Sequence, residues 1–300
     1  MVRRVRAGPE TVMLDFLTDP WSFEFMQRAL VASVLVSVVA AVIGSFVILK
    51  GMAFIGEALP HASFGGVAVA FVLGENLYIG GGIAALITAL LIGFISRRGH
   101  VKYDTAIGIL FVAMFALGIA IISREDNYTT DLFAFVFGNV LAVTWNDVWL
   151  TAAIAAFVLA LTVLFYKELL FTAYDPLMAA ASGLPVAPLQ YGLLALLALT
   201  TVIALQTVGV VLVVALLVTP AATAQLLVRS LPAIMLLGAA VGAASSLIGL
   251  YVAWHADLSA SASIVLTATA LFLLAFAFAP GRGLVWQTIL RRNPVPSRSS

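Results

Sequence analysis

A carboxylate and an imidazole stand close together in an otherwise apolar part of the sequence, within LKGMAFIGEALPHASFGG at residues 49 to 66. Glu57 and His61 are four positions apart, so on a helix they share one face. A carboxylate oxygen and an imidazole nitrogen make half of a binding site for a divalent ion such as manganese or zinc. A second copy of the chain in a two-fold dimer would supply the other half. The alternative is a polar pair at a helix end that contributes to packing only.

Pro60 lies between these two residues and complicates the local helix. Proline inside a helix removes a backbone hydrogen bond and clashes with the preceding turn, so we expect a helix that is broken here or has just begun. Ionisable groups inside membrane spans usually face a bundle interior or an aqueous path, and transporters place ligands at helix discontinuities. If the region crosses a membrane, the pair is a candidate for an ion route.

Three other places in the sequence carry polar side chains, but the arguments for a function there are weaker. In YDPLMAAASGLPVAP, residues 174 to 188, we expect a connecting loop with a short helix that Asp175 caps. His255 with Asp257 is a candidate cation contact on the outer face, although a plain loop is the simpler interpretation. His100 lies in a basic loop and is expected to be solvated.

The composition indicates which elements must position these residues. Of 300 residues, 63% are hydrophobic and 10% are charged, and the mean hydropathy is +1.14, whereas a soluble chain carries about a quarter charged residues. Runs long enough to cross a bilayer as helices predict an all-α, polytopic transmembrane bundle of eight or nine spans. A short interrupted stretch, 131 to 147, predicts a half-helix or re-entrant segment. The expected spans are 26–49, 54–73, 79–96, 104–122, 148–166, 189–206, 207–228, 233–253 and 262–279.

The Lys and Arg residues predict the orientation, because cytoplasmic loops retain them. Counting crossings places the basic loops on one face, predicted to be cytoplasmic, and most acidic loop residues on the other. The N-terminal arginines fall on the outer face, against the usual bias, so either the arm is an exception or one crossing is miscounted. The basic set is Lys50, Arg97, Arg98, Lys102, Lys167, Arg229, Arg282, Arg291 and Arg292; the outer set is Glu75, Glu125, Asp126, Asp131, Asp147 and Asp257, with Arg124; the N-terminal arginines are Arg3, Arg4 and Arg6.

The chain divides into three predicted parts: an amphipathic N-terminal arm (1–25), a transmembrane domain (26–280) and a disordered cytoplasmic tail (281–300). The absence of cysteine excludes disulfides and thiolate metal sites. A net charge of +1 gives no bulk attraction to nucleic acid. There is no G-x-x-x-x-G-K-[ST] sequence, so any use of ATP requires a partner.

Four stretches together resemble the permease subunits of ATP-binding-cassette importers for zinc, manganese and iron. They occur in the order and at the spacing typical of that family, over roughly residues 26 to 280. The stretches are GSFVILKGMAFIGEALPHASFGGVAVAFVLG, DLFAFVFGNVLAVTWNDV, YDPLMAAASGLP and VGVVLVVALLVTPAATAQLL.

The resemblance implies a homodimer in the bacterial plasma membrane, two cytoplasmic ATP-binding subunits and an extracytoplasmic metal-binding protein. It implies a metal role for Glu57 and His61, although the family usually has Asp at the first position, which leaves the metal preference open. No cofactor is expected to remain bound; the metal is the transported ion. The residues implied to dock on the ATPase are Asp175, Ala179, Gly183 and Pro185.

We therefore predict the permease subunit of an ATP-driven importer of manganese, zinc or iron, itself not an enzyme. One alternative is a secondary metal transporter driven by an ion gradient, which would normally carry more intramembrane acids than Glu57. Another is a membrane enzyme such as an intramembrane metalloprotease, but the chain has no H-E-x-x-H motif. A structural scaffold would leave the Glu57 and His61 pair unexplained.

Overall fold

The computed structural model describes residues 19–99, 101–124, 140–279 and 283, and within them every regular element is a helix. Among the described residues, nine helices are long and apolar enough to cross a membrane, which confirms the predicted polytopic bundle. They are α2 (Glu24–Leu49), α3 (Ile55–Leu73), α4 (Leu77–Arg98), α5 (Tyr103–Ile122), α7 (Trp145–Leu164), α10 (Val186–Val208), α11 (Val210–Leu227), α12 (Leu231–Ala256) and α13 (Ala260–Phe278). Shorter elements are the 3-10 turns η1 (Asp19–Ser22) and η2 (Val140–Ala142) and the helices α8 (Tyr166–Tyr174) and α9 (Pro176–Ala181).

Polar caps fix several helix starts. Asn76 begins α4, since its side-chain oxygen accepts hydrogen bonds from the backbone N–H groups of Tyr78 (2.9 Å) and Ile79 (3.3 Å). Thr144 and Asp147 form a reciprocal capping box at the start of α7. These caps satisfy N–H groups that have no partner inside the helix.

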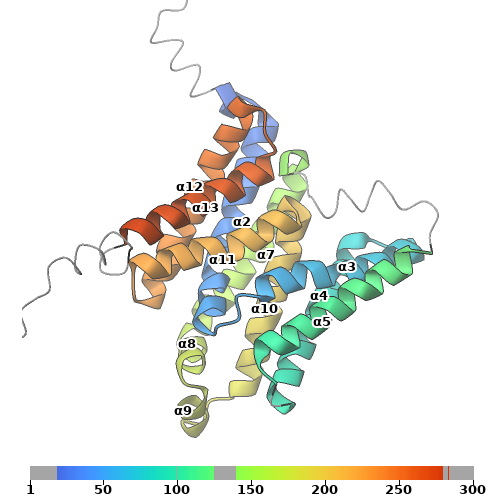
Figure 1. Ribbon diagram of the computed structural model, residues 1–300, viewed down its shortest axis with the longest axis vertical. Helices are drawn as coiled ribbons and strands as arrows, with labels where there is room; N and C mark the ends of the chain where they lie inside the picture. Colours follow the sequence, from blue (N-terminus) through green and yellow to red (C-terminus); the bar gives the residue numbers. More distant parts are fainter. Residues whose placement is uncertain (1–18, 100, 125–139, 280–282, 284–300) are drawn as a thin grey trace, which may run out of the picture.

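The helices form two packed groups (Figure 1). The body consists of α2, α7 and α10–α13, with α2 packed against α7, α10, α11 and α12. The second group is a layer of α3, α4 and α5 in which α3 contacts both of its neighbours. The layer joins the body where α4 and α3 meet α10 and α11.

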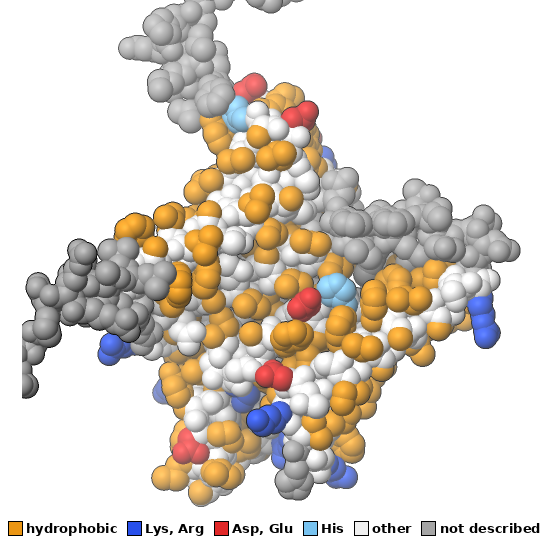
Figure 2. All heavy atoms as spheres, viewed as in Figure 1, with side chains coloured by type: hydrophobic (Ala, Val, Ile, Leu, Met, Phe, Trp, Pro, Cys, Tyr) orange, Lys and Arg blue, Asp and Glu red, His pale blue; other side chains and the backbone are white. Residues whose placement is uncertain are grey.

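Contacts between helix ends confirm how the crossings alternate. The Lys50 ammonium, after α2, donates to the backbone oxygen of Thr172 in α8 at 3.4 Å. The Arg97 guanidinium, at the end of α4, lies 5.9 Å from the ring centre of Tyr191 near the start of α10. These residues therefore share one end of the bundle, which we call the basic end: Lys50, Arg97, Arg98, Lys102, Lys167 and Arg229. Figure 2 shows most of its blue side chains towards the lower end of the molecule.

Several carboxylates lie at the opposite end, although Asp104, Glu168 and Asp175 lie at the basic end. The indole N–H of Trp145 at the start of α7 donates to Glu24 at the start of α2 (2.7 Å). Phe23 lies 4.9 Å from Trp254, near the end of α12, between ring centres. This acidic end contains Glu24, Glu75, Asp147 and Asp257. Because α2 begins here, three of the described helices, α2, α3 and α4, lie between this end and the basic loop that follows Arg97, as the sequence count required.

Several predictions fall partly or wholly outside the described residues. Residues 1–18 of the predicted arm, His100, the first part of the predicted re-entrant segment (131–139) and nearly all of the tail are among them. In the described remainder of that segment, η2 is followed directly by α7, which begins at Trp145. The division into arm, permease domain and tail stays a prediction.

Candidate metal site

The first turn of α3 lies beside the middle of another helix. A β-carbon placed on Gly56 would lie 2.8 Å from Cδ2 of Leu217 and 3.2 Å from Cγ2 of Val218. Both residues are central in α11. The residue that follows, Glu57, is therefore held within the length of the bundle and not at either end.

Pro60 does not break the helix. It is the sixth residue of α3, so of the two outcomes that the sequence allowed, the structure has the freshly begun helix. Without an N–H, Pro60 cannot donate to the carbonyl of Gly56 one turn earlier. Pro60 lies beyond the first four residues, whose N–H groups lack an intrahelical acceptor anyway, so it removes one intrahelical hydrogen bond, yet α3 continues past it to Leu73.

The His61 imidazole is held from three sides. Its Nδ1 lies 2.8 Å from the backbone oxygen of Glu57. The ring meets Phe111 and Phe115 of α5 in edge arrangements, with centroid distances of 5.6 Å and 6.0 Å. A carbonyl can only accept, so Nδ1 carries the hydrogen, which leaves the Nε2 lone pair of the neutral ring as the metal-binding atom. Such a hydrogen bond on the second ring nitrogen is usual for metal-binding histidines.

Glu57 lies one turn before His61 on the same face of α3 and is exposed in the single chain. In the described part of the chain, no three His, Cys, Asp or Glu side chains gather closely enough to hold a metal ion. One chain thus offers two ligands at this position, a carboxylate and an imidazole.

Sequence reasoning did not identify the two phenylalanines beside His61. They lie far along the chain in α5, at its middle, and only the packing of α5 on α3 brings them to the imidazole. A periodic pattern of aromatics in an apolar span carries no signal that distinguishes this role from lipid contact.

The segment from Asp175 to Pro185 forms the predicted short helix. The Asp175 carboxylate accepts from the Met178 backbone N–H at 2.9 Å and caps α9. Gly183 has φ +83°, a conformation that favours glycine, and Pro185 precedes the first residue of α10. The Ala179 side chain is fully buried.

Two neighbouring side chains on α9, which sequence reasoning missed, are exposed instead. Leu177 is 85% exposed and Met178 is 59% exposed. Both belong to the basic end, where α8 and α9 lie at the extremity of the molecule (Figure 1). The sequence shows that these two residues are apolar and lie in a loop segment, but only the structure shows that they are exposed, as apolar residues at a protein contact often are.

His255 and Asp257 lie at the end of α12, at the acidic end and away from the middle of the bundle. The Nδ1 atom of His255 lies 3.0 Å from the backbone oxygen of Tyr251, and Asp257 ends the helix with φ +54°. They are not part of the arrangement around Glu57 and His61.

Comparison with known proteins identifies the family. The model of the ABC 3 transport family matches residues 22–279. The manganese transport system membrane protein MntC of Listeria monocytogenes is 49% identical over 271 residues, covering 90% of this chain and 96% of the relative. The manganese import system permease protein ScaB of Streptococcus gordonii is 42% identical, covering 89% and 95%.

A solved structure agrees with the sequence relatives. PsaBC from Streptococcus pneumoniae in complex with Fab superposes with a TM-score of 0.79 at 40% identity, covering 94% of this chain and all of that one. These findings confirm the predicted resemblance and decide against a secondary transporter or a membrane enzyme. The chain belongs to the ABC 3 transport family and is a multi-pass membrane permease subunit, with ATP hydrolysis carried out by a separate subunit.

Proposed function

We propose that this permease conducts divalent manganese across the membrane and that Glu57 and His61 bind the ion on its way. The observation that carries the proposal is the hydrogen bond from His61 Nδ1 to the carbonyl of Glu57, which directs the imidazole to bind through Nε2. Carboxylate oxygen suits manganese, and imidazole is accepted by most divalent transition metals, zinc and ferrous iron included. The names of the relatives favour manganese among these three.

A homodimer completes the site in this proposal. A two-fold axis repeats the same surface on both copies, so two ligands per chain become four. The exposure of Glu57 in the single chain supports a role beyond it, because an unpaired carboxylate is costly at this depth of a membrane. Transport requires that these four ligands release the ion again after binding it.

The partners follow from the two ends of the bundle. At the basic end, α9 would dock against the ATP-binding subunit through Leu177 and Met178. The predicted contact residues Asp175, Gly183 and Pro185 would shape that segment, and Ala179 would support it from beneath. At the acidic end, the carboxylates would receive the metal from an extracytoplasmic binding protein, since negative potential there raises the local cation concentration.

Uptake of manganese, zinc and ferrous iron in metal-depleted cells tests the site. His61→Ala should abolish uptake, because second-shell changes alone cost about 10- to 100-fold in metal affinity and this change removes a ligand. His255→Ala, the matched histidine at the acidic end, should transport normally. Size-exclusion chromatography should show the same assembly with the ATP-binding subunit for both variants. Normal uptake by His61→Ala would refute the assignment.

A second variant addresses the choice of metal. Glu57→Asp restores the residue more common in the family and shortens the ligand by one methylene. Transport should persist, with a changed ratio of manganese to zinc uptake. If Glu57→Ala also transported all three metals normally, the carboxylate would have no role in the path.

A further inference from the structure

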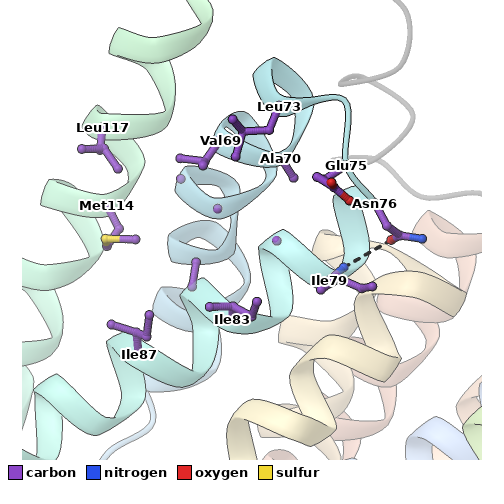
Figure 3. A pocket seen from close by; sticks show the side chains of 14 residues that line it. Val69, Ala70, Leu73, Glu75, Asn76, Ile79, Ile83, Ile87, Met114 and Leu117 are labelled. Carbon is purple, nitrogen blue, oxygen red and sulfur yellow. Dashed lines mark hydrogen bonds between the residues drawn. The ribbon is translucent and has the colours of Figure 1, made fainter.

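An apolar trough runs along the α3–α5 layer in the half nearer the acidic end. It lies between α4 and α5, and Figure 3 shows its lining residues on these helices and on α3 behind them. Its volume is about 410 Å³. Gly65, Gly66 and Gly80 contribute no side chains to it, and a β-carbon on Gly66 would collide with the carbonyl oxygen of Gly80. The close packing of α3 on α4 thus requires glycines, and the trough results in part from them.

The walls are long aliphatic side chains that are half exposed in the chain. Ile83 and Ile87 line it from α4, Val69 from α3, and Met114 and Leu117 from α5 (Figure 3). Among the residues that the structure describes, none with a charged side chain lines it below its mouth. The occupant of this trough must therefore be apolar over most of its length.

The length of the trough matches one leaflet of a bilayer. From Asn76 at the mouth to Ile87 at the far end, α4 advances 11 residues, or about 16 Å at about 1.5 Å per residue. Half of a hydrocarbon core of about 30 Å is about 15 Å. An apolar chain that starts at the interface would thus be covered along its whole length.

The width of the trough distinguishes between occupants. A volume of 410 Å³ spread over about 16 Å corresponds to a mean cross-section of about 25 Å². A helix with its side chains is about 10 Å across and has a cross-section of about 80 Å², so a helix of a second copy or partner could cover the open side of the trough but not enter it. A single hydrocarbon chain, with packing distances of about 4 Å, has a cross-section of about 20 Å².

Polar groups at the mouth indicate the headgroup. Glu75 is exposed at the turn between α3 and α4, and its carboxylate attracts a cation. The oxygen of the Asn76 side chain accepts the capping hydrogen bonds of α4, so the amide NH₂ is the end that can donate to a phosphate or ester oxygen. We propose that this trough binds one acyl chain of a phospholipid whose headgroup contains a primary ammonium group, in the leaflet at the acidic end.

The lipid and the metal site occupy opposite sides of α3. Gly66 is nine residues after Glu57, about two and a half turns at about 3.6 residues per turn, so it faces away from the pair. On α5, Phe111 and Phe115 meet His61 whereas Met114 and Leu117 line the trough. A bound lipid thus leaves the Glu57 and His61 face free.

The proposal can be tested by reconstituting the full-length permease in nanodiscs that contain equal amounts of phosphatidylethanolamine and phosphatidylglycerol. Native mass spectrometry then measures which phospholipid stays bound to the protein. The wild-type protein should retain one phospholipid per chain through detergent extraction. An exposed ion pair with Glu75 should favour phosphatidylethanolamine about threefold. Glu75→Gln should keep the lipid and lose this preference.

Variants that fill the trough should lose the lipid. Ile83→Trp on α4, and Val69→Phe on α3, should each reduce the retained phospholipid to background. The matched control is Ile109→Trp, since Ile109 is similarly exposed on α5 and does not line the trough. Elution volume and the helical circular dichroism signal identify any variant that fails to fold. Because there are two filling variants, the test remains possible if one of them does not fold.

If the Ile83→Trp and Val69→Phe variants both folded and both retained the same lipid, the proposal would be overturned. A wild-type protein that retains no lipid would overturn it as well. Loss of self-association without loss of lipid would assign the trough to an interface instead. None of these readouts measures uptake, so failure here is separate from failure of the proposed transport.

Discussion

Helices α2 and α5 are equally apolar and differ sharply in where they lie. Both have a mean hydropathy of 2.6 over their most apolar window, yet 67% of that window is buried in α2 and 22% in α5. Helix α2 is the centre of the body, and α5 is the outer member of the α3–α5 layer (Figure 1). Hydropathy therefore predicts that a segment enters the membrane and does not predict what it meets there.

The physical reason is that lipid tails and aliphatic side chains are equally apolar. Within the bilayer, helices associate through close packing and hydrogen bonds and not through transfer from water. Helix α2 shows both: the backbone of Leu217 lies against Gly44, and Ser37 meets Ser246 of α12 at 3.0 Å. On α5, a β-carbon at Gly108 would meet no atom of the described residues within 4 Å.

Substitutions of Gly44 in α2 and Gly108 in α5 should give the largest difference in stability. Gly44→Leu should destabilise the fold by at least the upper end of the range for overpacking, about 3 kcal/mol, because a β-carbon there would collide with the Leu217 carbonyl oxygen and the backbone cannot yield cheaply. Gly108→Leu in α5 should be neutral or stabilising, because leucine favours the helix and has open space. Thermal unfolding in detergent measures both. Equal losses would mean that α5 is covered in the folded protein as tightly as α2.

A matched pair of isoleucines should give a smaller difference. Ile43 in α2 is fully buried, whereas Ile109 in α5 is 61% exposed. Ile43→Ala should cost about 2 kcal/mol, the low end for such a truncation in water, because in lipid only packing is lost. Ile109→Ala should cost less than about 0.5 kcal/mol. Unfolding titrations in mixed micelles compare the two, and a larger loss from Ile109→Ala would reverse the assignment of inside and outside.

The spans were predictable from the sequence to within a few residues because each is a local property of the chain. The boundary between α10 and α11 was predicted at residues 206 and 207 and lies at Gly209, where φ is +82° and the chain turns without a loop. The burial of each span was not predictable. Apolar residues surround every helix, so no periodic stripe identifies the inner face.

The candidate metal site also has one part that was predictable from the sequence and one part that was not. The shared face of Glu57 and His61 followed from their spacing, which is local. The contact of His61 with Phe111 and Phe115 depends on how α5 packs on α3, and no local pattern contains it. The exposure of Leu177 and the burial of Ala179 in α9 likewise depend on the neighbours of that short helix.

The hydrogen bond between Ser37 and Ser246 should give the smallest effect. Each hydroxyl has one hydrogen, and both also contact a carbonyl of their own helix, Ser33 at 2.6 Å and Gly242 at 3.0 Å. The bond across α2 and α12 thus competes with bonds that each serine keeps when the helices separate. A double-mutant cycle with Ser37→Ala and Ser246→Ala should give a coupling of about 0.6 kcal/mol. A coupling above about 2 kcal/mol would mean that hydrogen bonding and not close packing holds α2 in the body, and would reverse the order of these effects.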